Sequence, residues 1–151
     1  MTYAQAFTGP FRRILVGWDC SPGASAALRA AAAVAEGDEA AHVVALAVLR
    51  PASHTEDRAE GAADFDGRQR LAQETFARAR DTLPAVLRQR ATLHFAESGD
   101  AAHTVCEYAY QHGFDLLVLG RHGTGGVLHP RLGHVAATAA RSSSVPVLLA
   151  P

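Results

Sequence analysis

The chain has 151 residues, of which 48% are hydrophobic and 19% charged, and these values are typical of one soluble globular domain. Its formal net charge of -1 at pH 7 argues against the basic surface of a nucleic-acid-binding protein. No apolar run reaches the length of about 18 residues that a membrane span needs. All 14 basic residues are arginine, which excludes a P-loop lysine and a lysine Schiff base.

Two cysteines, Cys20 and Cys106, provide no disulfide framework, which fits a reducing compartment. Residues 1–10 contain neither the apolar run nor the charged leader of a signal peptide. We therefore expect a cytoplasmic protein with a flexible arm over residues 1–10 and a single domain over residues 11–151.

In the first part of the chain, residues 12–18 predict a strand, because they are apolar after the two arginines at its start. Ser21 offers a hydroxyl that can cap a helix, and Pro22 suits the first helical position, so a helix is expected over residues 22–36. Residues 42–49 are apolar on both faces, which predicts a second strand in the centre of a sheet.

In the middle of the chain, residues 51–64 are polar and lack periodicity, which predicts a loop. A helix is expected from Asp66, and Pro84 must either end it or lie in the first turn of another. Residues 91–96 alternate between apolar and polar and predict a third strand. The apolar stripe of the helix consists of Ala72, Phe76, Ala79 and Leu83.

In the last part, a helix follows Asp100 and ends at Gly113, and the buried run 116–120 predicts a fourth strand. A loop of about a dozen residues then leads to a helix over residues 133–141 and a final strand over residues 145–149. The core positions of the helix after Asp100 are Ala102, Val105, Cys106 and Ala109.

The alternation of strands and helices predicts an α/β fold, a single-domain doubly wound (Rossmann-like) five-stranded parallel sheet with helices on both faces. Ligands of such sheets bind at the carboxyl ends of the strands, where the strand order reverses. Turns suited to phosphate follow the first and fourth strands, so we place the reversal between them. The apolar strand over residues 145–149, with Pro146 near its start, predicts a sheet edge through which a homodimer forms.

The connection after the fourth strand is rich in glycine. Glycine allows backbone N–H groups to approach a ligand closely, and a helix start adds free N–H donors and partial positive charge. Together they predict a phosphate-sized anion site. The alternative is that the glycines only permit a tight connection. The glycines are Gly120, Gly123, Gly125, Gly126 and Gly133.

Two motifs carry a resemblance to a known family. Residues 14–22 read Ile-Leu-Val-x-x-Asp-x-Ser-Pro, and Gly120, Gly123 and Gly133 are separated by two and nine residues. With these motifs the chain resembles the universal stress protein (UspA-like) family over residues 14–149. Members with this glycine pattern bind ATP, so the resemblance implies an adenine nucleotide as ligand, with or without Mg²⁺. The pattern continues with Ser or Thr, whereas this chain has His134.

The resemblance also implies roles for individual residues. Asp19 would accept hydrogen bonds from the ribose hydroxyls or hold a metal on the phosphates. The backbone of Gly17 and Trp18 would line the adenine, and Val48 would make an apolar contact with the base. The remaining nucleotide-binding residues implied are Gly120, Arg121, His122, Gly123, Gly133, His134 and Val135.

Each of these side chains has another interpretation. Asp19 is also a candidate helix cap, and the Trp18 indole can pack in the core instead of stacking on a base. Cys20 near a helix start can be a stabilised thiolate or an incidental residue. The spacing of the histidines matches no zinc motif, so we assign no metal. These histidines are His122, His129 and His134.

Three hypotheses for function follow. The first is a cytoplasmic homodimer that binds ATP or a related adenine nucleotide in a regulatory stress response. We assign no catalytic residue and expect at most slow hydrolysis, because no general base and arginine finger stand in place for phosphoryl transfer. The second is a nucleotide-free dimeric adaptor in which His134 fills the phosphate site and the loop contacts a protein partner. The third is an enzyme that uses Cys20 as a redox or nucleophilic group.

Overall fold

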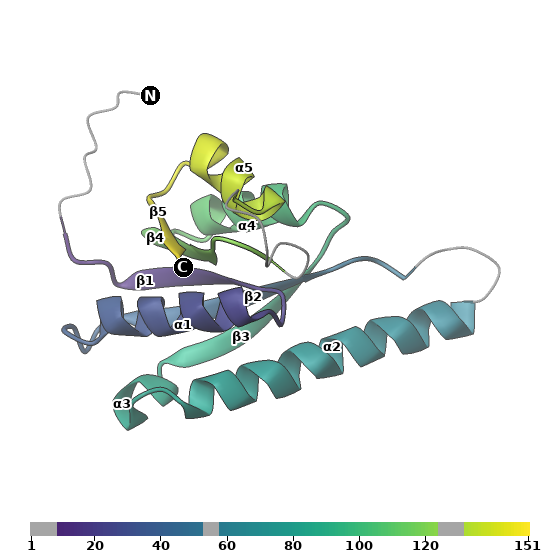
Figure 1. Cartoon of the computed structure of the whole chain (residues 1–151), viewed down its shortest axis with the longest axis horizontal. Coiled ribbons are helices and arrows are strands. Elements are labelled where there is room, and N and C mark those ends of the chain that lie inside the picture. The colour runs from purple at the N-terminus through teal and green to yellow at the C-terminus, as the bar shows by residue number, and fades with distance from the viewer. Residues whose placement is uncertain (1–8, 53–57, 124–131) are drawn as a thin grey trace.

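The computed structural model describes residues 9–52, 58–123 and 132–151, with the backbone alone for residues 58–63. Its centre is a parallel sheet with the strand order β3-β2-β1-β4-β5, which confirms the predicted doubly wound fold (Figure 1). The strands are β1 (Arg13–Trp18), β2 (His42–Leu49), β3 (Ala91–Glu97), β4 (Leu116–Gly120) and β5 (Val147–Ala150).

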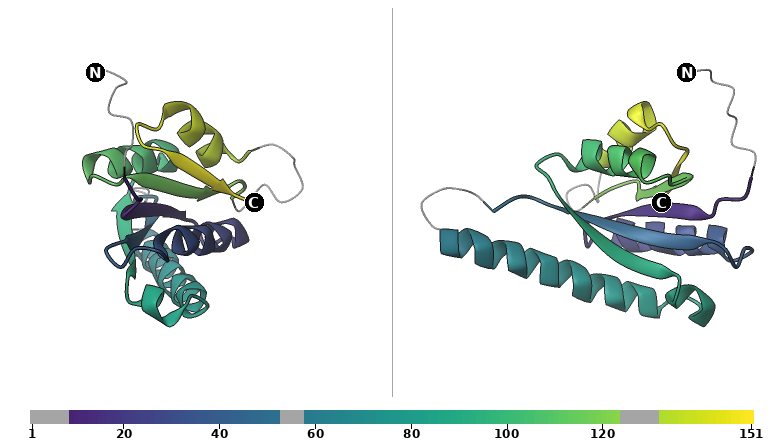
Figure 2. Two further views of the ribbon diagram at one scale, coloured as in Figure 1. Left: turned by 90° about the vertical axis from the view of Figure 1, so that its left-hand side faces the viewer. Right: turned by 180° about the vertical axis from the view of Figure 1, so that it is seen from behind.

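Helices cover both faces of the sheet, as predicted. Helices α1 (Pro22–Ala35) and α2 (Arg58–Asp81) lie on one face, and α4 (Ala101–Gln111) and α5 (His134–Ser142) lie on the other (Figure 2). The short helix α3 (Ala85–Arg88) joins α2 to β3. None of the helices in the described ranges combines the length and the apolar character that crossing a membrane requires.

The strand order reverses between β1 and β4, where the sequence places it. From β1 the chain moves outward to β2 and β3, and it then crosses back to β4 on the other side of β1. The connections that leave the two central strands therefore run in opposite directions. This divergence opens space at the carboxyl ends of β1 and β4.

The sheet separates two apolar cores because neighbouring residues of a strand point to opposite faces. In β1, Ile14, Val16 and Trp18 face α1 and α2, whereas Leu15 faces the other side together with Leu46 of β2. The alanines of α1 pack close to the first of these faces, since six apolar residues of that helix are buried. The six are Ala24, Ala27, Leu28, Ala31, Ala32 and Ala35.

Helix α2 begins earlier than the sequence predicts. Residues 51–64 were expected to form a loop, but the helix starts at Arg58. Its first turns extend beyond the ends of the strands (Figure 1), so they have no sheet to face and need no apolar stripe. At the other end the helix stops at Asp81, and α3 begins after Pro84, which stands at its N-cap position.

The last strand is shifted relative to its predicted range of 145–149, because it begins at Val147. The Ser143 hydroxyl donates to the carbonyl oxygen of Val145 at 2.7 Å and accepts from its N–H at 3.2 Å. This turn keeps Val145 out of the strand. The strand is an edge of the sheet, as expected.

A flexible arm was expected over residues 1–10. Residues 1–8 of this range lie outside the described residues.

Candidate functional site

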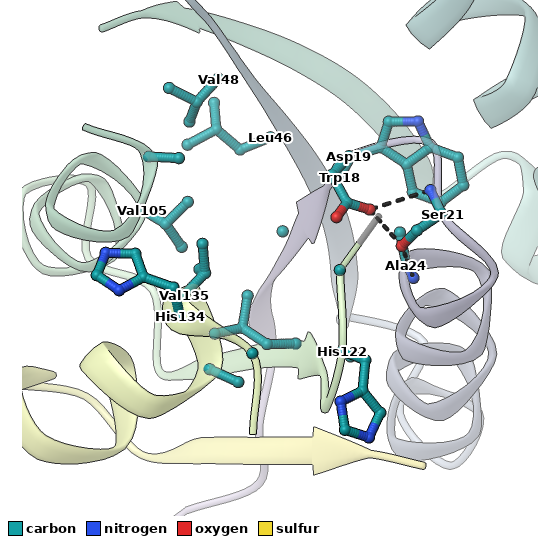
Figure 3. A pocket seen from close by; sticks show the side chains of 17 residues that line it. Trp18, Asp19, Ser21, Ala24, Leu46, Val48, Val105, His122, His134 and Val135 are labelled. Atoms are coloured by element: carbon teal, nitrogen blue, oxygen red, sulfur yellow. Dashed lines mark hydrogen bonds between the residues drawn. The ribbon is translucent and has the colours of Figure 1, made fainter. Parts of the chain in front are cut away.

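A cavity of about 440 Å³ lies at the carboxyl ends of the central strands, and its size suits a small-molecule ligand (Figure 3). The strands β1, β2 and β4, the helices α4 and α5 and the start of α1 all contribute to its wall. Ten of the residues that the sequence predicts as nucleotide-binding line this cavity: Gly17, Trp18, Asp19, Val48, Gly120, His122, Gly123, Gly133, His134 and Val135.

Asp19 follows β1 directly and supports the start of α1. Its Oδ1 atom accepts hydrogen bonds from the backbone N–H of Ser21 at 3.0 Å and from the Ser21 hydroxyl. The Ser21 oxygen in turn accepts from the N–H of Ala24 at 3.1 Å, so Ser21 is the predicted helix cap. The residue between them, Cys20, has a φ of 66° that reverses the chain at this point. Asp19 is therefore oriented through Ser21 and does not itself cap the helix.

The glycines stand where backbone segments meet closely. A Cβ atom on Gly120 would lie 2.7 Å from the backbone of Gly23, and one on Gly123 would lie 2.9 Å from Oδ2 of Asp19. A Cβ on Gly133 would lie 3.3 Å from the backbone nitrogen of Gly123. The two described ends of the glycine-rich connection thus pack against each other and against the Asp19 carboxylate.

Backbone hydrogen bonds hold the base of this connection. The N–H of Gly133 donates to the carbonyl oxygen of Arg121 at 2.7 Å, and the N–H of Arg121 donates to that of Ala150 at 2.9 Å. Gly133 is the N-cap of α5, which has no side-chain cap, so the first N–H groups of the helix lack helical partners beside the cavity. The predicted Gly125, Gly126 and His129 lie outside the described residues.

The indole of Trp18 packs in the core. It is 4% exposed, meets the ring of Phe76 edge-on at 5.5 Å, and donates from Nε1 to the Thr75 hydroxyl at 3.3 Å. Figure 3 shows the indole turned away from the cavity, on the far side of Asp19. Of the two interpretations of this residue, packing is therefore the one that the structure adopts.

Of the three other polar residues of the motif, two line the cavity and one lies outside it. His134 is exposed, and Figure 3 shows its ring beside α4, pointing away from Asp19, so the imidazole does not fill the cavity. His122 is half-buried, and among the described residues its buried Nδ1 atom has no hydrogen-bond partner. Arg121 is exposed and lies outside the residues that line the cavity.

Sequence reasoning missed most of the apolar wall. Leu46 lies two residues before Val48 and shares its face of β2, so strand periodicity was the signal that could have found it. Val105 was predicted as a core residue of α4 and also lines the cavity. The other residues that were not singled out as ligand contacts are Ser21, Ala24, Ala101, Leu119 and Ala136.

Both cysteines are free. Cys20 is half-buried against the core on the α1 face and is not among the residues that line the cavity. Burial, with a smaller contribution from Asp100, raises the pKa of the Cys106 thiol, which packs against the core under α4 and α5. In the described ranges, no three His, Cys, Asp or Glu side chains are grouped so that they could hold a metal ion.

The fold and the cavity define the class of protein: a doubly wound α/β domain with a glycine-lined pocket at the point where the strand order reverses. The sequence model of the Universal stress protein family matches residues 10–151. The chain therefore belongs to the universal stress protein family. No curated protein matches its sequence.

Solved structures share the fold. Universal stress protein UspA from Lactobacillus plantarum has a TM-score of 0.82 and 20% identity, over 95% of this chain and 100% of that one. The universal stress protein from Archaeoglobus fulgidus in complex with dAMP has a TM-score of 0.66 and 20% identity, over 95% and 100% of the two chains. A universal stress protein in complex with cAMP has a TM-score of 0.67 and 22% identity, over 95% and 99%.

Proposed function

We propose that this chain binds an adenine nucleotide, with ATP as the leading candidate, in the cavity at the ends of β1 and β4, and that it acts as a regulator. The observation that carries the proposal is the meeting of the Gly123 backbone, the Asp19 carboxylate and the start of α5 around one cavity. The adenine nucleotides in two solved structures with this fold support the choice of ligand.

Each part of the cavity suits one part of a nucleotide. The apolar wall of Leu46, Val48 and Val105 suits the base. The carboxylate of Asp19 is exposed, and its Oδ2 atom accepts no hydrogen bond from the described residues. This oxygen suits the ribose hydroxyls or Mg²⁺ on the phosphates. The N–H groups at the start of α5, beside Gly123, suit the phosphates. Slow hydrolysis or none is expected, because binding groups alone do not activate a water molecule.

Mass spectrometry of the ligand that is released when the purified protein is denatured tests this proposal. We expect ATP, ADP or AMP in the released fraction, and we expect Mg-ATP at millimolar concentration to raise the melting temperature, because a ligand that binds only the folded state stabilises it. An empty protein whose melting temperature does not respond to Mg-ATP would contradict nucleotide binding and favour the adaptor hypothesis.

A His134→Ser variant tests the departure from the family motif. We expect it to bind ATP about tenfold more tightly, since a hydroxyl at the first residue of α5 adds one hydrogen bond to a charged phosphate. Isothermal titration calorimetry measures the change, with Thr138→Ser in the same helix as the control. Unchanged affinity would show that residue 134 does not contact the phosphates.

The outer edge of the sheet suits self-association. Strand β5 has no neighbour on one side in the described structure, and its Leu148 is 37% exposed. An apolar edge of this kind pairs readily with a second copy of itself. We propose a homodimer through residues 145–149.

We also propose a cytoplasmic location. The free thiols of Cys20 and Cys106 support it, because disulfide bonds are rare in that reducing compartment.

A further inference from the structure

A second cavity, of about 280 Å³, lies at the opposite end of the strands from the nucleotide site. It is formed at the starts of β1 and β2, along β3, and at the C-terminal end of α4. Val44 of β2 and Phe114 before β4 provide apolar surface. We call it the basic groove because of the side chains that line it: Arg13, His42, Arg90, His94 and His112.

The basic groove has an excess of positive charge. Two arginines and three histidines line it, and no carboxylate is among its described lining residues. Two carboxylates adjoin the lining residues. Asp38 pairs with Arg12 at 2.7 Å, and this hydrogen bond, with a smaller contribution from the charge of Arg90, lowers the pKa of Asp38. Asp115 accepts from the backbone N–H groups of Arg12 and Arg13 at 3.1 Å.

Backbone carbonyl groups hold the two guanidinium groups in place without neutralising them. Arg90 donates from Nη1 to the carbonyl oxygens of Asp38 and Ala41, both at 2.8 Å. Arg13 donates to those of His112 at 3.0 Å and Gly113 at 3.2 Å. A guanidinium group fixed in this way retains its charge and further N–H donors for an oxyanion.

The histidines are held by an aromatic residue of α4. The Tyr108 hydroxyl lies 3.1 Å from Nδ1 of His94, and the Tyr108 ring lies 4.0 Å from that of His112. His42 stands at the start of β2, where it pairs with Arg13 of β1, and His94 of β3 pairs with Leu46, four residues further along β2.

We propose that the basic groove is a binding site for a small oxyanion, a phosphoryl or sulfuryl group. The ligand is a free inorganic ion or the oxyanion group of a small organic ester. The site is separate from the nucleotide cavity and does not depend on the function proposed for that cavity.

Sulfate tests the proposal because it is a dianion at neutral pH and has the tetrahedral shape of the proposed ligand. In two-dimensional amide NMR with sulfate, we expect the largest shifts at Gln89, Thr92 and His94, which line the groove. Chloride at equal ionic strength is the control. Titrations with inorganic phosphate and phenyl phosphate then distinguish the free ion from an ester.

Substitution of two groove histidines provides the second test. The His42→Gln/His94→Gln double variant should bind sulfate about tenfold more weakly, because two imidazole groups that line the groove are removed. His103→Gln is the matched control, since His103 is exposed on α4 and pairs with Glu107 at 3.0 Å, outside the groove. Sulfate shifts confined to Gly120 and Gly123, or an unchanged affinity in the double variant, would overturn the proposal.

Discussion

Replacing Gly23 with alanine is expected to lower the free energy of unfolding by about 2–3 kcal/mol, although the same change in a helix ordinarily raises it by up to about 1 kcal/mol. The reason is a contact outside the helix. A Cβ atom on Gly23 would overlap the carbonyl oxygen of His122, and because both groups are backbone, no side-chain rotation relieves the overlap. Urea denaturation followed by circular dichroism measures the change.

Gly67 provides the matched control for this substitution. It also lies in a helix, α2, but nothing is within 4 Å of the place where its Cβ would be. Gly67→Ala should therefore raise the free energy of unfolding by about 0.5–1 kcal/mol. A neutral or stabilising effect of Gly23→Ala would contradict the close contact between α1 and the segment after β4.

Replacing Asp19 with asparagine is expected to weaken nucleotide binding by about ten- to a hundredfold, which corresponds to the loss of a hydrogen bond to a charged group. The fold should remain intact. The Oδ1 atom of asparagine can still accept from the N–H and hydroxyl groups of Ser21, so the start of α1 keeps its cap. Only the charge and the second oxygen, which faces Gly123, are lost.

Titration calorimetry with Mg-ATP, run together with thermal melting, separates binding from stability in this variant. Asp66→Asn on the exposed surface of α2 removes the same charge away from the cavity and should bind like the unmodified protein. Equal affinity in the Asp19 variant would mean that this carboxylate does not contact the nucleotide, and the ribose or metal role would be withdrawn.

Much of the fold could be predicted because a helix-starting or glycine-containing turn follows three of the strands, β1, β3 and β4. The bounds of β2 agree with the prediction residue for residue, since the polar His42 begins the apolar run and Arg50 and Pro51 follow its end. The position of the reversal was also predictable. Asp19 follows one strand and a glycine cluster follows another, and these are the residue types that a ligand site needs.

What could not be predicted depends on tertiary contact. The first turns of α2, from Arg58, have no sheet beneath them and therefore carry no periodic signal. Gly23 resembles any glycine near a helix start, and only the structure brings it against His122. Likewise, Trp18 sits at a strand end, where a tryptophan can face a ligand or the core, and the position of Phe76 decides between them.

The backbone hydrogen bond between Gly133 and Arg121 ties together the two ends of the segment between them, and Ala150 anchors that junction to the last strand. Once its ends are joined, doubling the length of a loop costs only about 0.6 kcal/mol of closure entropy. Insertions and deletions between these anchors therefore leave the sheet almost undisturbed. We therefore expect that a change in the number of residues between these two anchors alters ligand preference more than the stability of the sheet.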